Sequence, residues 1–307
     1  MGLWIDTDMG FDDIAAILTI GHAGFSIDGV SLVFGNAPLE QVRRNAAAAR
    51  QVFGWRFPMS IGRETSVLGQ IETAQRILGH TGIPTLGRSL PACDPEPGED
   101  AFHALAHWLE STARPCRILA LGPLTNIAAL VLARPDLARR IDDLTWMGGG
   151  AGAGNHTASA EFNAYADPEA VAIVLAHSLP LRMVDLDFCR KILCRPEEAE
   201  HLRTLGGGNA NLLADLFGGF IAIATSRGRP AMAFYDPAAA AAFIRPDLVT
   251  FRPVGIAMEL AGMLTRGRTV VETRSSLTAF NAELAIEAEQ DRLRSVILDA
   301  LSAEAAR

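Results

Sequence analysis

The sequence predicts a single α/β domain over residues 1–307, with a largely parallel central sheet flanked by helices. Short runs rich in Ile, Leu and Val alternate with longer amphipathic or Ala-rich runs. This alternation is typical of parallel strands joined by right-handed helical crossovers. The chain has 307 residues, of which 49% are hydrophobic and 20% are charged, so it can build one substantial core. That balance excludes disordered and fibrous proteins.

The strands and helices of this sheet are expected in a regular order along the chain. Five short apolar runs are the expected strands: Leu3–Ile5, Gly29–Phe34, Arg117–Leu121, Leu144–Met147 and Leu181–Val184. Six longer runs are the expected helices: Asp12–His22, Leu39–Phe53, Ala101–Thr112, Leu124–Leu132, Pro168–Ala176 and Asn209–Thr225. Ligands of such sheets bind beyond the carboxyl ends of the strands. Polar residues directly after each strand are therefore the candidates for a site.

Three further segments complete the predicted domain. Leu86–Asp100 is rich in Pro, Gly and acidic residues. We expect it to be a surface loop rather than a domain linker, because the strand–helix alternation resumes beyond it. Val254–Glu272 is expected to form a β-hairpin that turns near Thr265–Arg268, and Gln290–Ala305 a closing amphipathic helix.

The charge balance bears on the partners of the protein. Lys and Arg total 27 against 35 Asp and Glu, a net charge of −8, whereas binding to nucleic acid or to an anionic membrane depends on surplus positive charge. No apolar run approaches the ~20 residues that cross a bilayer. Asp6 follows the first five residues without a basic segment, so no signal peptide is expected. We expect a cytoplasmic protein whose four cysteines are free thiols.

The strongest local signal is the acidic segment Ile5–Asp13, at the end of the first expected strand. It places four carboxylates, those of Asp6, Asp8, Asp12 and Asp13, within eight residues. Two carboxylates ~4 Å apart repel each other by ~4 kcal/mol at an effective dielectric constant of 20, and a bound cation reverses that sign. Oxygen ligands favour a hard cation such as Ca²⁺ or Mg²⁺. Helix capping is an alternative role for Asp12 and Asp13, but it does not require Asp6 or Asp8.

The same segment, DTDMGFDD, resembles the DxDxGxDD signature of the nucleoside hydrolases of the inosine–uridine-preferring type, in which Pro is common at the position of Met9. Further segments are similar to motifs of that family, in the same order and as far as about residue 270: Val33-Phe34-Gly35-Asn36 with Asn45, Leu121-Gly122-Pro123-Leu124-Thr125-Asn126, Met147-Gly148-Gly149-Gly150 through Asn155, Glu161-Phe162-Asn163 and Asp167-Pro168, Tyr235-Asp236-Pro237, and Thr265-Arg266-Gly267. The resemblance implies a Rossmann-like core and hydrolysis of the N-glycosidic bond of ribonucleosides.

The resemblance also implies a calcium ion and the residues that hold it. Asp8, Asp13, Asp236 and the carbonyl oxygen of Leu121 would be the ligands. Such a mixed oxygen set suits the loose coordination of calcium better than the strict octahedron of magnesium. Asp8 would also be the general base that takes a proton from the attacking water. Asp6 would lie behind Asp8 and orient it.

Carboxylates, amides and one thioether are implied for the ribose: Asp12, Asn36, Met147, Asn155, Glu161, Asn163 and Asp236. Asp12 and Asp236 would accept hydrogen bonds from the 2′- and 3′-hydroxyls, Asn36 would bind on the same side, and Met147 would pack on the ring. Asn155, Glu161 and Asn163 would bind hydroxyls on the 5′ and 3′ sides. Taken singly, Asn155 is equally well a turn residue and Glu161 a solvated charge.

The base pocket is where the chain departs from the family pattern. The family commonly has a His as general acid just before the last metal-binding Asp, and this chain has Tyr235 there. The pKa of a phenol is ordinarily near ~10, so Tyr235 is either a hydroxyl donor or a stacking platform for the base, or it simply packs beside Asp236. A purine-specific branch of the family also lacks this His and uses aromatic stacking. His80 is either a second base-pocket residue or an ordinary loop histidine.

Other interpretations of the sequence remain open at this point. Asp-x-Asp after a strand also begins the magnesium-dependent phosphatases of the haloacid-dehalogenase type, although Gly10 stands where they have Thr or Val. A catalytically impaired nucleoside-binding protein on the same scaffold is a second alternative, favoured only by Tyr235. The resemblance further implies a homodimer or homotetramer, with Arg227–Arg229 on a mobile flap.

Overall fold

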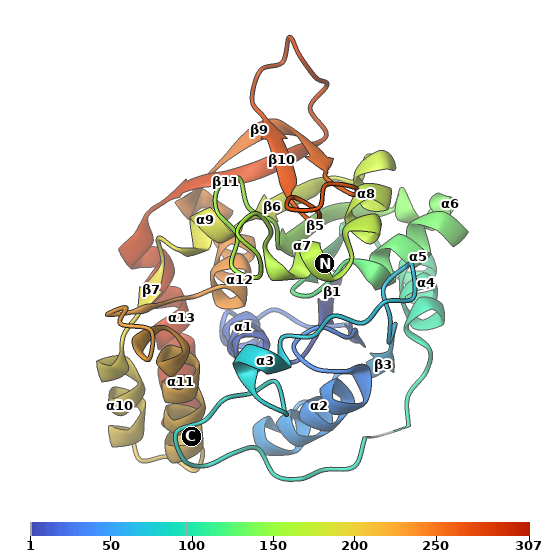
Figure 1. The fold of residues 1–307 in the computed structure, drawn as a ribbon. Helices are drawn as coiled ribbons and strands as arrows, with labels where there is room; N and C mark the ends of the chain where they lie inside the picture. The colour runs from blue at the N-terminus through green and yellow to red at the C-terminus, as the bar shows by residue number, and fades with distance from the viewer. Residues whose placement is uncertain (1, 96) are drawn as a thin grey trace.

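A nine-stranded sheet runs through the computed structural model, which describes residues 2–95 and 97–307 (Figure 1). Within these residues the strand order is β10-β9-β11-β6-β5-β4-β1-β2-β3. The strands are β1 (Gly2–Thr7), β2 (Gly29–Leu32), β3 (Met59–Ile61), β4 (Cys116–Ala120), β5 (Ile141–Met147), β6 (Leu181–Val184), β9 (Val249–Met258), β10 (Thr269–Glu272) and β11 (Ala282–Ala288). A separate two-stranded sheet joins β7 (Leu193–Cys194) to β8 (Met232–Ala233).

Most of the large sheet is parallel. Each pair of neighbours in the run β6-β5-β4-β1-β2-β3 is parallel, and β11 also pairs in parallel with β6. Strand β9 is antiparallel to both of its neighbours, β10 and β11. Parallel strands β1, β2, β4 and β5 therefore end at one edge, where the loops that follow them meet.

Helices cover both faces of the sheet. They are α1 (Phe11–His22), α2 (Leu39–Phe53), α3 (Gln75–Leu78), α4 (Ala101–Ser111), α5 (Thr125–Ala133), α6 (Pro135–Ala138), α7 (Phe162–Ala166), α8 (Pro168–Ala176), α9 (Leu186–Cys189), α10 (Pro196–Thr204), α11 (Ala210–Thr225), α12 (Asp236–Ile244) and α13 (Gln290–Ala305), with a 3₁₀ turn at Pro246–Leu248. Figure 1 shows α1, α12 and α13 on one side and α4, α5 and α8 on the other.

Strand β1 lies at the centre because its side chains feed two cores. Leu3 and Ile5 pack into the core beneath α1, α2 and α11–α13, whereas Trp4 packs with Trp108 into the core beneath α4, α5 and α8. All six residues of β1 are buried. A strand covered on both faces carries apolar residues on both, as this one does up to Asp6.

The structure confirms the α/β class and the predicted elements, with small shifts at their ends. Strand β2 ends at Leu32 instead of Phe34, because the chain turns at Gly35 to bring Asn36 toward the end of β1. The predicted hairpin is confirmed, but β9 begins at Val249 and also pairs with β11. The sequence analysis missed β3, β7 and β8, which are only two or three residues long, and β11. The segment 86–100 contains no helix or strand among its described residues, as expected for a loop.

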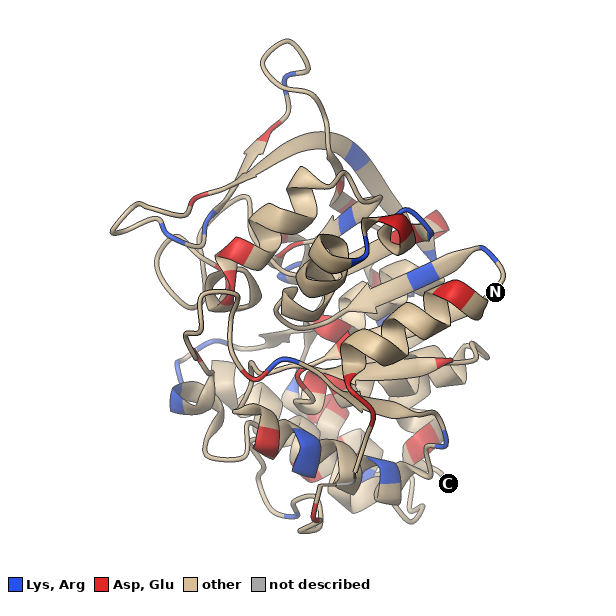
Figure 2. Cartoon of the chain, turned by 90° about the vertical axis from the view of Figure 1, so that its right-hand side faces the viewer, with Lys and Arg blue, Asp and Glu red and all other residues tan. Residues whose placement is uncertain are grey.

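Charged side chains are distributed over the helices and loops. Figure 2 shows Lys and Arg interspersed with Asp and Glu along the chain. Across the described residues, every helix is too short or too polar to cross a lipid bilayer.

Candidate active site

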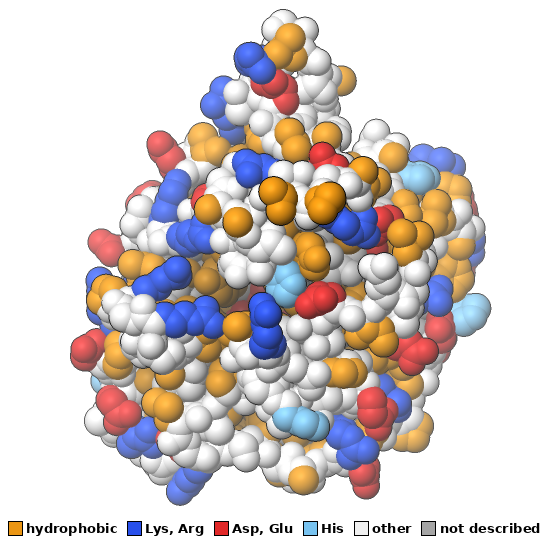
Figure 3. Space-filling view, in the orientation of Figure 1, with side chains coloured by type: hydrophobic (Ala, Val, Ile, Leu, Met, Phe, Trp, Pro, Cys, Tyr) orange, Lys and Arg blue, Asp and Glu red, His pale blue; other side chains and the backbone are white. Residues whose placement is uncertain are grey.

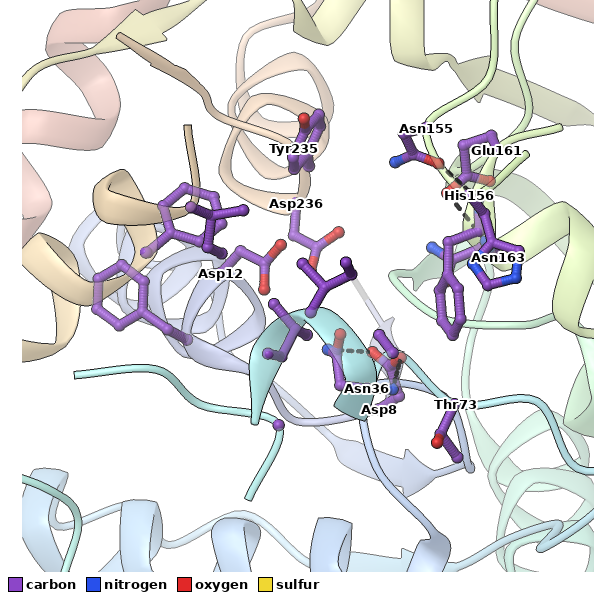
Figure 4. Close-up of a pocket in the computed structure, with 18 of the residues that line it drawn as sticks. Asp8, Asp12, Asn36, Thr73, Asn155, His156, Glu161, Asn163, Tyr235 and Asp236 are labelled. Carbon is purple, nitrogen blue, oxygen red and sulfur yellow. Dashed lines mark hydrogen bonds between the residues drawn. The ribbon is translucent and has the colours of Figure 1, made fainter. Parts of the chain in front are cut away.

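A cavity of about 440 Å³ opens at the edge of the sheet where the parallel strands end (Figure 4). The loops after β1, β2, β4 and β5 supply its polar wall, together with the N-termini of α7 and α12. The sequence-predicted residues that line it are Asp8, Asp12, Asn36, Leu121, Met147, Asn155, Glu161, Asn163, Tyr235 and Asp236. The space-filling view shows the cavity as a hollow on the front face, with histidine and acidic side chains at its rim (Figure 3). The structure therefore gathers segments that are far apart in the sequence.

Asp8 is held in place by the turn that follows β2. Its Oδ2 accepts from the backbone N of Asn36 at 2.7 Å and its Oδ1 from Asn36 Nδ2 at 3.0 Å. Gly35 makes this approach possible, because a Cβ at that position would fall 2.1 Å from Asp8 Oδ2. The V-F-G-N segment thus fixes the orientation of the Asp8 carboxylate.

Asp13 lies behind Asp8 and is fully buried. It accepts hydrogen bonds from Thr7 Oγ1, from Gly10 N at 2.7 Å and from Asn36 Nδ2 at 3.1 Å. Its bond to Gly10 caps α1, so the capping role considered for Asp13 is present. The same carboxylate is also part of the acidic cluster.

The carboxyl groups at this junction strongly disfavour one another's ionisation. Ligand oxygens of Asp12, Asp13 and Asp236 all lie within 4.8 Å of one another. Burial, then the neighbouring carboxylates, raises the pKa of Asp12 to about 7 and that of Asp8 and Asp236 well above the usual range. A divalent cation would compensate this repulsion.

The carbonyl of Leu121 is a further oxygen donor at the cavity. Asn163 Nδ2 donates to this carbonyl and to that of Met147, at 3.0 Å each. Asp8, Leu121 and Asp236 line one cavity with Asp13 directly behind. The donors are carboxylates and a backbone carbonyl, which are the ligand types of calcium and magnesium.

Glu161 builds the opposite wall. It caps α7, where Oε1 accepts from Asn163 N at 2.9 Å and Oε2 from Ala164 N at 3.0 Å, and Oε2 also accepts from Gly149 N at 2.8 Å. Burial raises its pKa to about 7. Glu161 is therefore a buried carboxyl group that stabilises the wall, and the alternative of a solvated charge is wrong.

The other end of the cavity is apolar. The residues there are aromatic and aliphatic side chains of α1, α3, α11, β8 and a nearby loop: Phe11, Ile77, Leu78, Pro84, Phe220, Ile223 and Met232. Tyr235 lies against Phe220 in an edge-on contact, with ring centroids 6.3 Å apart. Burial raises the pKa of Tyr235 to about 12. A flat aromatic ligand fits this end better than a sugar does.

Two predicted site residues lie elsewhere. His80 is exposed and lies outside the residues that line the cavity; its carbonyl accepts from Gln75 Nε2 at 2.6 Å, which holds its loop. Asp6 accepts from Ser31 Oγ and from Asn126 Nδ2 at 2.8 Å, so its hydrogen bonds secure the neighbouring β2 and α5. The hydrogen bonds that orient Asp8 come from Asn36.

The sequence analysis also missed residues that line the cavity. His156 stands next to Asn155, its Nε2 lies 3.3 Å from Glu72 Oε1, and its ring packs 4.7 Å from that of Tyr165. Phe162 lies within the E-F-N motif. Its position in that motif could have identified it as a cavity residue, whereas Phe11 and Phe220 look like ordinary core residues in the sequence.

Comparison with known proteins agrees with this geometry. The family model described as inosine-uridine preferring nucleoside hydrolase matches residues 3–295. The chain belongs to this family. Membership accounts for the order of the sequence motifs and sets aside the haloacid-dehalogenase-type alternative.

Individual relatives of this nucleoside hydrolase cover nearly its full length. The non-specific ribonucleoside hydrolase RihC of Salmonella paratyphi B is 32% identical over 298 residues, covering 96% of this chain and 95% of the relative. The purine-preferring ribonucleoside hydrolase of Gardnerella vaginalis superposes with a TM-score of 0.91 at 26% identity, covering 100% and 99%. A plant nucleoside hydrolase shares the fold, with a TM-score of 0.91 at 23% identity and coverage of 98% and 99%.

The approach of Asn36 to Asp8 predicts the effect of Gly35→Ala. The new methyl group would displace the Asp8 carboxylate, and misplacing an active-site side chain by about 1 Å lowers turnover by about 100-fold. We expect that loss in kcat/KM for ribonucleoside hydrolysis. Gly208→Ala is the control, because no heavy atom among the described residues lies within 4 Å of a Cβ built there. Equal activity of the two variants would contradict the prediction.

The turn after Asp8 predicts that proline, which is common in the family at the position of Met9, is not tolerated here. Met9 has φ 39°, and its backbone N donates to Thr7 Oγ1 at 3.1 Å. Proline fixes φ near about −65° and removes the donor, so Met9→Pro should lower the free energy of unfolding by about 3 kcal/mol. Met9→Leu keeps the volume and should cost less than about 1.5 kcal/mol. Urea denaturation of both variants measures the difference, and a Met9→Pro protein as stable as Met9→Leu would refute this account of the turn.

Proposed function

We propose that this protein is a calcium-dependent ribonucleoside hydrolase that yields ribose and a free base and favours purine nucleosides. The observation that carries the proposal is the group of buried carboxylates of Asp8, Asp13 and Asp236 beside a cavity with one polar and one apolar end. A ribonucleoside has the same division into a polar sugar and a flat base. Membership of the family and the resemblance to a non-specific ribonucleoside hydrolase support the substrate class.

Asp8, Asp13, Asp236 and the carbonyl of Leu121 would hold the calcium ion. Calcium accepts six to eight oxygen ligands in flexible geometry, which suits carboxylates mixed with a backbone carbonyl. When bound, the ion offsets the carboxylate charges and lowers the pKa of nearby water. Asn163 fixes the direction of the Leu121 carbonyl through its 3.0 Å hydrogen bond.

Asp8 would act as the general base. Asn36 binds both of its oxygens, which holds the carboxylate plane at the cavity wall. A base so held is within reach of a water placed in the cavity. One oxygen of Asp8 takes the proton as the water oxygen attacks the anomeric carbon. The C–N bond breaks, its electron pair leaves with the base, and the base takes up a proton from solvent water.

The sugar would lie between the acidic junction and the wall formed by Asn155, Glu161 and Asn163. Asp12 and Asp236 accept from the 2′- and 3′-hydroxyls, with Asn36 on the same side. Asn155, Glu161 and Asn163 bind the 5′ and 3′ sides, and Met147 packs on the ring. Ribose presents only hydroxyl groups, which amides and carboxylates bind as donors and acceptors. A 2′-deoxy sugar would leave buried carboxylates without partners.

The base would lie against Tyr235 and Phe220. A raised pKa makes the Tyr235 hydroxyl a weaker proton donor than free phenol, so we assign Tyr235 to stacking rather than to proton transfer. Larger rings gain more from stacking, which favours purines. The purine-preferring relative from Gardnerella vaginalis supports the same preference. Arg227 lines this end from the loop after α11, which we propose to be the mobile flap.

The cellular setting follows from the same proposal. The net charge of −8 supports free ribonucleosides as substrates instead of nucleic acid, and offers no attraction to an anionic membrane. We propose a cytoplasmic homodimer or homotetramer.

Removal of the metal tests the proposed function. Protein dialysed against EDTA should hydrolyse inosine at least about 100-fold more slowly than untreated protein, because the carboxylates then repel one another and water is not activated. Excess calcium should restore the rate, and magnesium should restore less of it. Release of ribose from a panel of ribonucleosides is the measurement. Full turnover by metal-free protein, or binding of nucleosides without turnover in calcium, would refute the proposal.

Substitution of Tyr235 tests the purine preference. Stacking of a base on an aromatic ring is worth about 1–3 kcal/mol, so Tyr235→Ala should lower the ratio of kcat/KM for inosine to that for uridine by about tenfold. Tyr235→Phe keeps the ring and should retain the ratio. A large fall in kcat for Tyr235→Phe would instead identify the hydroxyl as a proton donor. A wild-type enzyme that prefers uridine would contradict the assignment.

A further inference from the structure

The wall that carries Asn155 is a loop held by side chains of another segment. Residues 148–160, between β5 and α7, form no helix or strand. Asn155 is exposed, so packing does not fix its position. Hydrogen bonds close the loop on itself: Gly154 N donates to Ala158 O at 3.1 Å and Asn155 N to Ala160 O at 3.2 Å. The closed loop can therefore shift as one piece unless something outside it holds it.

Thr269 and Asp185 hold the start of the loop at Gly150 N and Ala151 N, at 2.8 and 3.0 Å. Arg190, directly after α9, provides the hold next to Asn155. Its Nη1 donates to Ala153 O at 2.8 Å and its Nη2 to Gly154 O at 3.0 Å, so one guanidinium spans two successive carbonyls. Asp187 braces it, because Asp187 Oδ1 accepts from Arg190 Nη1 at 3.2 Å while Oδ2 accepts from Gly152 N at 2.6 Å. We call these two side chains the Asp187–Arg190 clamp.

The clamp acts on the residues immediately before Asn155. The Oδ1 of Asn155 accepts from Phe162 N at 3.0 Å, and its Nδ2 is turned toward the centre of the cavity (Figure 4). Rotation of the Gly154 peptide would move this amide directly. The segment that carries Arg190 also contacts the part of the cavity wall at Tyr235, since Cys189 Sγ lies 3.7 Å from the carbonyl oxygen of Tyr235.

We propose that Arg190, braced by Asp187, is a positioning residue that sets Asn155 for the 5′ side of the sugar. The inference rests on the proposed function for the identity of the ligand. Arg190 touches neither the sugar nor the base in this arrangement. It fixes the backbone from which Asn155 donates, and charge-assisted hydrogen bonds to carbonyls are strong enough to do so.

A comparison of two substrates tests the clamp. The kcat/KM values of inosine and 5′-deoxyinosine are measured for wild type, Arg190→Ala and Arg190→Lys. We expect the preference for inosine to fall about tenfold in Arg190→Ala, because only inosine has the contact to lose. Arg190→Lys reaches one carbonyl and should retain part of the preference. A general loss of stability would lower the kcat/KM values of both substrates equally.

The control is Arg245→Ala. Arg245 forms a similar two-point contact with Asp247, and its side chain is 37% exposed against 34% for Arg190, but it lies at the end of α12 that points away from the cavity. Its removal should leave the substrate ratio unchanged. Should Arg190→Ala fail to fold, Asp187→Asn replaces it and should lower the ratio in the same direction.

Amide hydrogen exchange gives a readout that does not depend on turnover. The amides of Gly154 and Asn155 should exchange faster in Arg190→Ala than in Arg245→Ala. If wild type turns over no ribonucleoside, the proposed function fails while this exchange comparison still decides whether the clamp exists. An unchanged substrate ratio together with unchanged exchange would overturn the inference. An equal loss of kcat/KM for both substrates would also overturn it.

Discussion

Mutual repulsion among buried carboxylates is the constraint on which the rest of this structure depends. Asp8, Asp13 and Asp236 are each at most 3% exposed and lie where β1 ends and α1 and α12 begin. Nearby hydrogen-bond donors and helix termini reduce the cost of that placement. Thr7, Gly10 and Asn36 donate hydrogen bonds to the carboxylates, and the N-termini of the two helices contribute favourable dipoles.

The cavity is divided because two parts of the chain build it. Strand ends and the loops that follow them supply carboxylates and amides, since polar groups are tolerated where the sheet stops. The apolar end comes from α11 and from the loop that contains α3, through side chains such as Phe220, Ile223 and Ile77. Tyr235 lies where the two parts meet, directly before Asp236. Its ring therefore belongs to the apolar end of the cavity while its neighbour belongs to the polar end.

Sequence reasoning predicted the fold and much of the cavity because strand ends carry their polar residues in short, ordered motifs. Asp8, Asn36 and Asn163 could be found in this way. It failed where position depends on long-range packing. His80 and His156 are both loop histidines in the sequence, and only the fold shows that His156 faces the cavity. Asp6 stands two residues before Asp8, yet its hydrogen bonds lead into the sheet, which the sequence did not indicate.

The apolar end of the cavity is built on loops and on α11, away from the strand junctions, and this affects how such enzymes can diverge. Side chains such as Ile77, Pro84 and Ile223 can be exchanged without disturbing the sheet edge, since surface segments tolerate variation better than the strands that support them. Descendants of one ancestral scaffold can thus change their preference for the part of the ligand at the apolar end through substitutions in these segments. The acidic junction at the end of β1 and the start of α12 does not depend on these segments.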